Sequence, residues 1–449
     1  MKTFDVVIIG GGPAGYVAAI RSAQLEMTTA IIEKSRLGGM CLNWGCVPSR
    51  RLMESARLYR RFLSAGSFGI EGADPDHIHF NWQKSLQEKD KIVTRLVKGV
   101  EFLMKKNRVE VISGEGRLLS NARVEVNGEA IGAGKIIIAT GSRPNRAPLA
   151  QLPDALVMEI DQLYSSPTLP DNIVVVGGDV VACETASLLS LLGKKVTMVA
   201  SQERLVPWMD DAIIKFVTDR FKKDGIRVLM GSPVPVAAKG GIKVGSETIA
   251  CDLVLNASRR TAILPDFGDV PVDLENGFIR VNEFMQTSVP SVYAAGDVTG
   301  QIFAHIASAQ GACAINHMAG LREPVDYRTM PTTIYMEPEV GSVGLSEVQI
   351  TDAGTEYVKG EFPMSVNSRA MVEGTPEGFV KMLADQKYGE LLGVHIVAEH
   401  AGDLIAEAAM CIKTEGTLDD LSRVVHAHPT VSETLLEASF KAMGKPLHV

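Results

Sequence analysis

The chain has 449 residues, of which 46% are hydrophobic and 22% charged, with a formal net charge of -8. This composition excludes a disordered chain, and the negative charge without a dense basic run argues against nucleic acid as a partner. The length suits about three domains. No apolar run approaches the ~20 residues of a membrane span. A strand-like run follows directly after Met1, so we expect no leader and a cytoplasmic location.

Two segments repeat one design. Residues 6–33 and 173–199 each contain an apolar strand, a glycine-rich turn, a helix with small residues and a second apolar strand. Each segment predicts a βαβ unit that binds a dinucleotide. From about residue 328, short strand-like runs alternate with a helix-like stretch at 403–414, which is typical of an α+β domain.

The first glycine turn predicts a phosphate site. Gly10 allows a tight turn, Gly12 lets the backbone approach a pyrophosphate, and Gly15 allows the helix to pack closely on the strand. Glu33 closes the next strand, where a carboxylate can accept hydrogen bonds from a ribose. A purely structural turn is the alternative, but strand, helix and acid all stand in register for a nucleotide.

A cysteine pair is the most informative feature of the chain. Residues 38–48, GGMCLNWGCVP, place Cys41 and Cys46 five positions apart. In a regular helix such residues have Cα atoms ~8 Å apart, beyond the ~7 Å limit for a disulfide. The glycines and Pro48 predict a distorted helix start that brings the thiols closer. The pair could instead bind a metal, but no third and fourth ligand lie at suitable spacing.

This cysteine segment resembles the active-site segment of the pyridine nucleotide-disulfide oxidoreductases, and the resemblance extends over essentially the whole chain. Residues 426–433, HAHPTVSE, are more similar to the matching motif of dihydrolipoyl dehydrogenases than to that of glutathione reductases. The chain shows no terminal cysteine pair, which disfavours mercuric reductases and the high-molecular-weight thioredoxin reductases.

The resemblance implies that the first nucleotide is FAD. It assigns the ribityl chain to Asp297 and favours the dihydrolipoyl dehydrogenases through Ala304 and His305. Thr140 and Gly141, which follow a buried strand, belong to a second segment shared with two-dinucleotide flavoproteins. We expect these residues to bind FAD together with the first glycine turn.

The resemblance also assigns catalytic roles. Cys41 is expected to be the interchange thiol and Cys46 to lie against the flavin. The thiolate is the reactive form, so a base is needed, and the resemblance gives that role to His428, oriented by Glu433. In the family this histidine reaches the disulfide of the other subunit, which implies a homodimer.

One exchange affects the predicted flavin site. Arg50 stands where the family usually has lysine, close to the flavin N5 and paired with the glutamate that matches Glu184. The positive charge is kept, but a planar fork replaces a point charge. The exchange either alters the flavin potential or is tolerated without effect.

The second glycine turn departs from the family pattern. Asp179 stands at the second fingerprint glycine and Ala182 at the third, where alanine is a known variant. At an effective dielectric of ~20, like charges ~4 Å apart repel by ~4 kcal/mol. The next strand ends at Ala200 instead of a glutamate, and one lost ribose hydrogen bond costs about 1.5–3 kcal/mol. Together these changes predict weak NAD binding, unless a local rearrangement tolerates them.

We therefore expect an α/β chain with two Rossmann-like dinucleotide-binding domains plus a C-terminal α+β dimerisation domain. The predicted boundaries are 1–144 and 270–325 for the FAD-binding domain, 145–269 for the NAD-domain-like unit and 326–449 for the dimer-interface domain. The expected function is oxidation of dihydrolipoyl groups, free or on a carrier protein, through Cys41, Cys46 and FAD to NAD or another acceptor.

Three alternatives stay open. The first is a reductase of another low-molecular-weight disulfide. The second is a flavin disulfide oxidoreductase with a non-nicotinamide electron partner. The third is a structural subunit of a lipoyl-bearing complex that has lost turnover, against which the retained cysteines, His428 and Glu433 argue.

Overall fold

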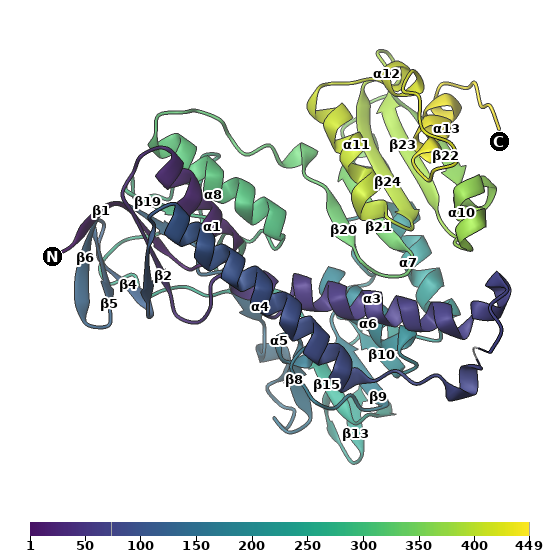
Figure 1. The fold of residues 1–449 in the computed structure, drawn as a ribbon, viewed down its shortest axis with the longest axis horizontal. Coiled ribbons are helices and arrows are strands. Elements are labelled where there is room, and N and C mark those ends of the chain that lie inside the picture. The colour runs from purple at the N-terminus through teal and green to yellow at the C-terminus, as the bar shows by residue number, and fades with distance from the viewer. Residues whose placement is uncertain (73, 449) are drawn as a thin grey trace.

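The first sheet is built around the N-terminal strand in the computed structural model, which describes residues 1–72 and 74–448 (Figure 1). β1 is a central strand because it pairs in parallel with β2 on one side and β6 on the other. β19 returns late in the chain and pairs with β6, which completes the sheet. In spatial order its strands are β3 (Glu110–Ser113), β2 (Thr29–Glu33), β1 (Thr3–Ile9), β6 (Glu129–Ile138), β5 (Arg123–Val126) and β4 (Gly116–Ser120), with β19 (Val292–Ala294) also on β6.

Two helices pack unusually closely on each other beside this sheet. A Cβ on Gly311 in α8 would lie 2.3 Å from the carbonyl oxygen of Ala14 in α1, so only glycine allows the contact. We call the first sheet and its helices the first lobe, and likewise the second and third sheets with theirs. The packing of α8 on α1 joins the last helix of the first lobe to its first. The helices of this lobe are α1 (Pro13–Gln24), α4 (Trp82–Lys106) and α8 (Ala304–Met318).

The second sheet is parallel and repeats the first design. Its central strand β9 is buried along almost all of its length and precedes the second glycine turn. In spatial order its strands are β11 (Arg227–Leu229), β10 (Lys195–Val199), β9 (Asn172–Val176), β15 (Leu253–Asn256) and β8 (Val157–Glu159). Its helices are α5 (Ile160–Leu163), α6 (Val180–Leu191) and α7 (Asp211–Lys223), and an antiparallel ribbon of β12 (Val236–Ala238), β13 (Gly241–Val244) and β14 (Glu247–Ala250) stands beside it.

Two short antiparallel strand pairs accompany the first two sheets. β7 (Ser142–Pro144) leaves the first sheet and pairs with β16 (Arg260–Ala262), which leaves the second. The small pair β17 (Leu274–Glu275) and β18 (Phe278–Ile279) follows. The chain therefore crosses from the first lobe to the second and back through neighbouring strands.

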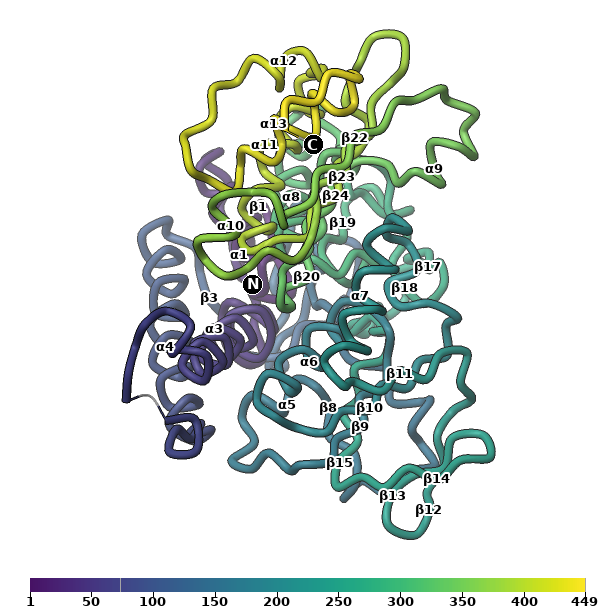
Figure 2. The backbone as a smooth tube through the Cα atoms, turned by 90° about the vertical axis from the view of Figure 1, so that its right-hand side faces the viewer, coloured from purple at the N-terminus to yellow at the C-terminus, as the bar shows by residue number. Residues whose placement is uncertain are grey.

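The third sheet is antiparallel and lies above α3 and α6 in the view of Figure 2. Its strands, in spatial order, are β20 (Thr332–Ile334), β21 (Glu339–Gly344), β24 (Leu391–Ala398), β23 (Phe379–Asp385) and β22 (Tyr357–Pro363). Its helices are α9 (Glu347–Asp352), α10 (Ser368–Glu373), α11 (Ala401–Lys413), α12 (Leu418–Ser422) and α13 (Glu433–Ala442). The fold class predicted from the sequence is confirmed, including the helix expected at 403–414.

Helix α3 (Cys46–Leu63) ties the first lobe to the third sheet. Arg57 is buried in α3, and its Nη2 donates a hydrogen bond of 2.8 Å to the carbonyl oxygen of Met336. Its Nη1 donates to Glu339 at 3.0 Å. No helix in the described ranges is both long and apolar enough to cross a membrane.

A buried charge cluster fixes the second lobe to the third. Asp210 caps the start of α7, and its carboxylate lies 2.7 Å from the ammonium of Lys381 on β23. Lys381 also contacts Glu347 at 2.6 Å, and its side chain is only 4% exposed. Such a pair adds little net stability when intact, but removing one partner leaves an uncompensated buried charge.

We expect Lys381→Met to lower the free energy of unfolding by about 3–5 kcal/mol, because Asp210 would keep its buried charge without a cation. Lys359→Met is the matched control: Lys359 contacts the same Glu347 at 2.8 Å, but its side chain is 46% exposed. That exposed pair should contribute less than about 1 kcal/mol. Thermal unfolding of both variants measures the difference, and equal losses would contradict the assignment.

Candidate active site

The first glycine turn leaves an open approach to the start of α1. Gly10 adopts φ +110°, and a Cβ there would lie 2.2 Å from the carbonyl oxygen of Ala139. A Cβ on Gly15 would lie 1.9 Å from the carbonyl oxygen of Gly10. Gly12 is extended, and within the described residues a Cβ on it would meet just one atom closer than 4 Å, the Cα of Gly39 at 3.8 Å. The turn and the N–H groups of the helix start fit the phosphates of a dinucleotide.

Glu33 stands beside this turn. Its Oε2 accepts a hydrogen bond of 2.7 Å from the backbone N–H of Gly11, and its Oε1 accepts one of 2.7 Å from Ser35. A carboxylate oxygen has two lone pairs, so ribose hydroxyl groups can still bind to the same side chain. The backbone contacts fix the carboxylate in the position that the sequence predicted for it.

Asp297 belongs to a buried polar chain that the sequence did not indicate. The hydroxyl of Ser142 donates to Asp297 at 2.6 Å, and Nε of Arg260 donates to that hydroxyl at 2.7 Å. Burial raises the pKa of the Asp297 carboxyl, against the effect of the Ser142 hydrogen bond. Ser142 and Arg260 meet only because β7 pairs with β16, a contact between residues more than a hundred positions apart.

The remaining residues predicted to bind FAD lie where β6, α8 and the third sheet approach one another. The Thr140 hydroxyl donates to the carbonyl oxygen of Ile263, and Gly141 takes φ +76°. Ala304 is the first residue of α8, and Nε2 of His305 lies 2.7 Å from the carbonyl oxygen of Pro331. Burial lowers the pKa of His305. The polar side chains of Thr140 and His305 are therefore bound to backbone.

The two cysteines lie on either side of a helix break. Helix α2 (Gly39–Asn43) ends before Gly45, whose backbone at φ −130° and ψ −106° is not helical, and α3 starts at Cys46. Cys41 and Cys46 are free thiols on the two sides of this break. The distorted helix start that the glycines and Pro48 of the sequence predicted is therefore present.

The two thiols differ in acidity. The hydrogen bond from Cys41 and the charge of Arg50 lower the pKa of Cys46, although burial opposes this shift. The same hydrogen bond, together with burial, raises the pKa of Cys41. Cys46 is therefore the more acidic thiol of the pair, and the thiolate is the form that reacts with disulfides or transfers electrons.

Arg50 is held by two neighbours from other lobes. Its Nη2 lies 2.7 Å from Oε1 of Glu184 on α6, and its guanidinium carbon lies 3.5 Å from the centre of the Tyr335 ring. The backbone N–H of Tyr335 donates to the same Glu184 oxygen at 2.9 Å. The buried Nη1 of Arg50 has no hydrogen-bond partner among the residues described, so it remains available to a bound group. No sequence motif marks Tyr335; only the fold brings it here.

His428 and Glu433 form the expected pair. Nδ1 of His428 lies 2.9 Å from Oε1 of Glu433, while Oε2 accepts from the backbone N–H of Thr430 at 2.7 Å. Although burial opposes it, these two hydrogen bonds lower the pKa of Glu433. The His428 side chain is 73% exposed. With Nδ1 engaged, Nε2 is the atom that can exchange a proton with a group outside this turn.

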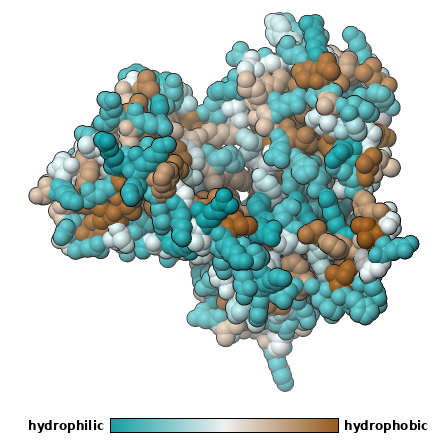
Figure 3. Space-filling view, viewed as in Figure 1, coloured by the Kyte–Doolittle hydropathy of each residue, from teal (hydrophilic) through white to brown (hydrophobic). Residues whose placement is uncertain are grey.

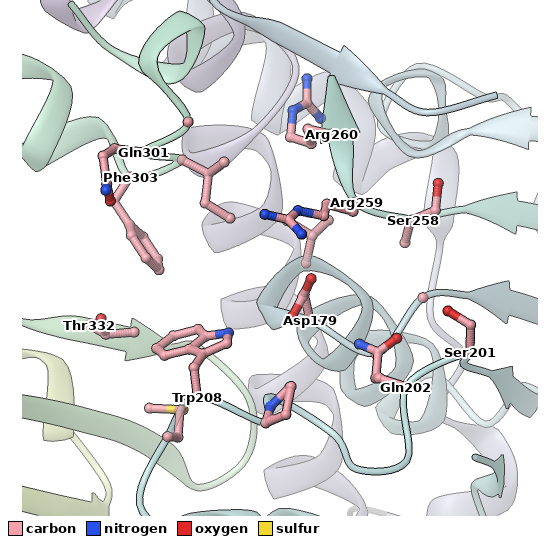
Figure 4. Close-up of a pocket in the computed structure, with 18 of the residues that line it drawn as sticks. Asp179, Ser201, Gln202, Trp208, Ser258, Arg259, Arg260, Gln301, Phe303 and Thr332 are labelled. Carbon is pink, nitrogen blue, oxygen red and sulfur yellow. The ribbon is translucent and has the colours of Figure 1, made fainter. Parts of the chain in front are cut away.

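The second glycine turn opens into a cavity of about 1040 Å³ between the second lobe, the start of α8 and the third sheet (Figure 4). Asp179 is placed at the start of α6 and points into this cavity, while Ala182 and Ala200 are buried at the positions expected from the sequence. Gln202 was given no role from the sequence, and its amide lies against Gly178. Its place two residues beyond the strand end was the available signal. An aspartate at the turn does not fit the pyrophosphate of NAD.

The Tyr335 ring should set the acidity of Cys46 through Arg50. In Tyr335→Leu we expect the pKa of Cys46 to rise by about one unit, because a lost cation–π contact of about 0.5–2 kcal/mol lets the guanidinium move. Tyr335→Phe keeps the ring and should match the unmodified protein. The pH dependence of alkylation at Cys46 in the reduced enzyme measures the shift. An unchanged profile in Tyr335→Leu would contradict the role of the ring.

Comparison with known proteins gives matches over nearly the full length. Residues 4–313 match the model of the pyridine nucleotide-disulphide oxidoreductases, and residues 330–439 match the dimerisation domain of the same family. The chain is 38% identical to a dihydrolipoyl dehydrogenase of Bacillus subtilis, with 99% of each chain covered. It is also 38% identical to the mitochondrial dihydrolipoyl dehydrogenase of Pisum sativum, covering 99% of this chain and 92% of that one.

A solved structure extends the likeness to three dimensions. The crystal structure of LpdA from Mycobacterium tuberculosis matches with a TM-score of 0.89 at 25% identity, covering 98% of this chain and 99% of the other. The family models, the sequence relatives and the fold agree. The chain belongs to the pyridine nucleotide-disulphide oxidoreductase family.

Proposed function

We propose that this protein is a flavin-dependent oxidoreductase that oxidises dihydrolipoyl groups, free or on a carrier protein, through Cys41 and Cys46. One observation carries the proposal: two free thiols flank a helix break, and Arg50, one turn after Cys46 on the same helix, is held by Glu184 at 2.7 Å and lowers the pKa of Cys46 together with hydrogen bonding from Cys41. Dihydrolipoyl dehydrogenases are among the relatives that match nearly the full chain, which supports a dithiol substrate. A cytoplasmic location and the domain boundaries stay predictions.

The proposed reaction is a dithiol–disulfide exchange. Starting from the Cys41–Cys46 disulfide, one dihydrolipoyl thiolate attacks the sulfur of Cys41, and Cys46 leaves as a thiolate. The second dihydrolipoyl sulfur, once deprotonated, attacks the lipoyl sulfur of the mixed disulfide. This releases Cys41, which takes up a proton to become a thiol. The substrate has lost two electrons and two protons; the cysteine pair has gained the two electrons, Cys41 has taken one proton, and the other proton goes to His428.

FAD supplies the two-electron acceptor chemistry when it is bound. The residues that would hold it are the first glycine turn, Glu33, Asp297 and the guanidinium of Arg50. The buried, unpartnered Nη1 of Arg50 is the feature of this chain that fits a further polar ligand beside Cys46. Arg50 thus would stabilise negative charge on either the thiolate or the bound group.

His428 is proposed to take the substrate proton from across a dimer interface. Its exposure supports a target outside its own chain. Exposed apolar side chains gather near the end of α3 and on α10, on the right-hand side of Figure 3, where a second copy could cover them. These residues are Leu58, Phe62, Phe68, Ile70, Met371 and Val372. A homodimer agrees with the matched dimerisation domain.

Anaerobic stopped-flow reduction tests the substrate. Dihydrolipoamide should reduce the flavin of the holoenzyme, and Cys46→Ser should slow turnover by at least about 10³-fold, as expected for a lost reacting group. Cys411→Ser is the matched control, since Cys411 lies on α11, outside the proposed site. Flavin reduction by a monothiol but not by dihydrolipoamide would favour the reductase of another disulfide. Unimpaired turnover in Cys46→Ser would exclude the mechanism.

Mixed dimers test the position of His428. His428→Gln alone should lower turnover by about 10²–10⁴-fold, the usual contribution of an acid–base group. Co-expression of His428→Gln with Cys46→Ser should restore about a quarter of the activity, because half of the dimers are mixed and each holds one intact site. If His428 served its own chain's cysteines, the mixture would stay as inactive as its components.

A further inference from the structure

The two glycine turns have the same backbone but different side chains. Gly12 and Asp179 each precede a helix, at φ −73°, ψ −173° and φ −91°, ψ −176°. A Cβ on Gly177 would lie 2.2 Å from the carbonyl oxygen of Ala257, as one on Gly10 would from Ala139. The side chain of Asp179 is therefore unstrained, and it occupies the space that the first turn keeps open at Gly12.

The carboxylate of Asp179 points into the cavity (Figure 4). Within the described part of the chain its side chain forms no cap hydrogen bond at the start of α6. A negative charge thus lies beside the helix start that binds pyrophosphate in related turns. Repulsion between this carboxylate and a pyrophosphate ~4 Å away weakens dinucleotide binding by about 10²–10³-fold.

The ribose end of the cavity has changed in the same direction. The backbone hydrogen bond from Gly177 to Val199, at 2.9 Å, matches the one from Gly10 to Ile32 at 2.8 Å, so Ala200 stands where Glu33 stands in the first unit. The amide nitrogen of Gln202 would lie 2.7 Å from a Cβ on Gly178, and it covers the turn in place of a carboxylate. The ribose hydroxyl groups of NAD lose their anionic partner.

The walls of the cavity offer a flat ring two aromatic side chains and one cationic donor. Trp208 and Phe303 face each other edge to face, with ring centres 6.5 Å apart. Trp208 belongs to the loop that follows Val206. The N–H of Val206 donates to the carbonyl oxygen of Gly178 at 2.8 Å, which holds this loop over the second glycine turn. Arg259 reaches into the middle of the cavity in Figure 4. Its guanidinium can donate to a carbonyl oxygen and stabilise the negative charge that develops there on reduction.

We propose that this cavity, unlike the NAD site of its relatives, rejects dinucleotides and takes an uncharged planar aromatic carbonyl compound, a quinone, as the electron acceptor. The acceptor role rests on the proposed function, and the binding does not. Overall, one dihydrolipoyl group becomes the cyclic disulfide, and its two electrons and two protons convert one quinone into one hydroquinone. Along α6, Asp179 is five residues from Glu184, about 8 Å at 1.5 Å per residue, so the cavity adjoins the Arg50 site.

Binding to the oxidised holoenzyme tests the cavity without any turnover. By titration calorimetry, 2-methyl-1,4-naphthoquinone should bind at least tenfold more tightly than NADH. Trp208→Ala should weaken the quinone about three- to tenfold, as expected for a lost aromatic contact. The double substitution Asp179→Gly with Ala200→Glu should tighten NADH about 10²–10³-fold and change quinone affinity less than threefold.

Asp171→Asn is the matched control, because Asp171 lies at the opposite end of β9, immediately before the strand. It should alter neither affinity. NADH binding as tight as the quinone, or no quinone binding, would overturn the proposal. If the quinone binds as expected while dihydrolipoamide fails to reduce the flavin, the proposed function fails and the cavity assignment stands.

Discussion

The ion pair between Arg50 and Glu184, covered by Tyr335, is the contact on which the arrangement of the three lobes depends. Arg50 comes from α3, Glu184 from α6 and Tyr335 from the segment after β20. The pair is partly buried, so its charges are weakly screened, and separating the lobes would leave both without a partner. The same guanidinium lowers the pKa of Cys46. The arginine that joins the lobes therefore also acts on the thiol.

Two further buried charges also join the lobes. Arg57 connects α3 to the third sheet, and Lys381 connects that sheet to Asp210 at the start of α7. The directional requirements of these bonds are stricter than those of apolar contacts, so they fix the angle between lobes as well as their proximity. The segment that carries Trp208, two residues before Asp210, is held in place over the second glycine turn by the same bonds.

The two glycine turns show which constraints come from the backbone and which from a ligand. Gly10 and Gly177 are both required by positive φ and by a carbonyl oxygen 2.2 Å from a Cβ position. Asp179 adopts a φ that any residue tolerates, so only a bound pyrophosphate would demand glycine there. The fold itself therefore tolerates the exchange of glycine for aspartate at this position.

The sequence by itself determined the strand–turn–helix units, the helix break between Cys41 and Cys46, and the pairing of His428 with Glu433, because these depend on residues close together in the chain. Tertiary structure alone decided the stack of Tyr335 on Arg50, the support of Asp297 by Ser142 and Arg260, and the amide of Gln202 over Gly178. These contacts join segments with no shared periodicity or motif. Their partners are chosen by how the sheets pack, which no local pattern encodes.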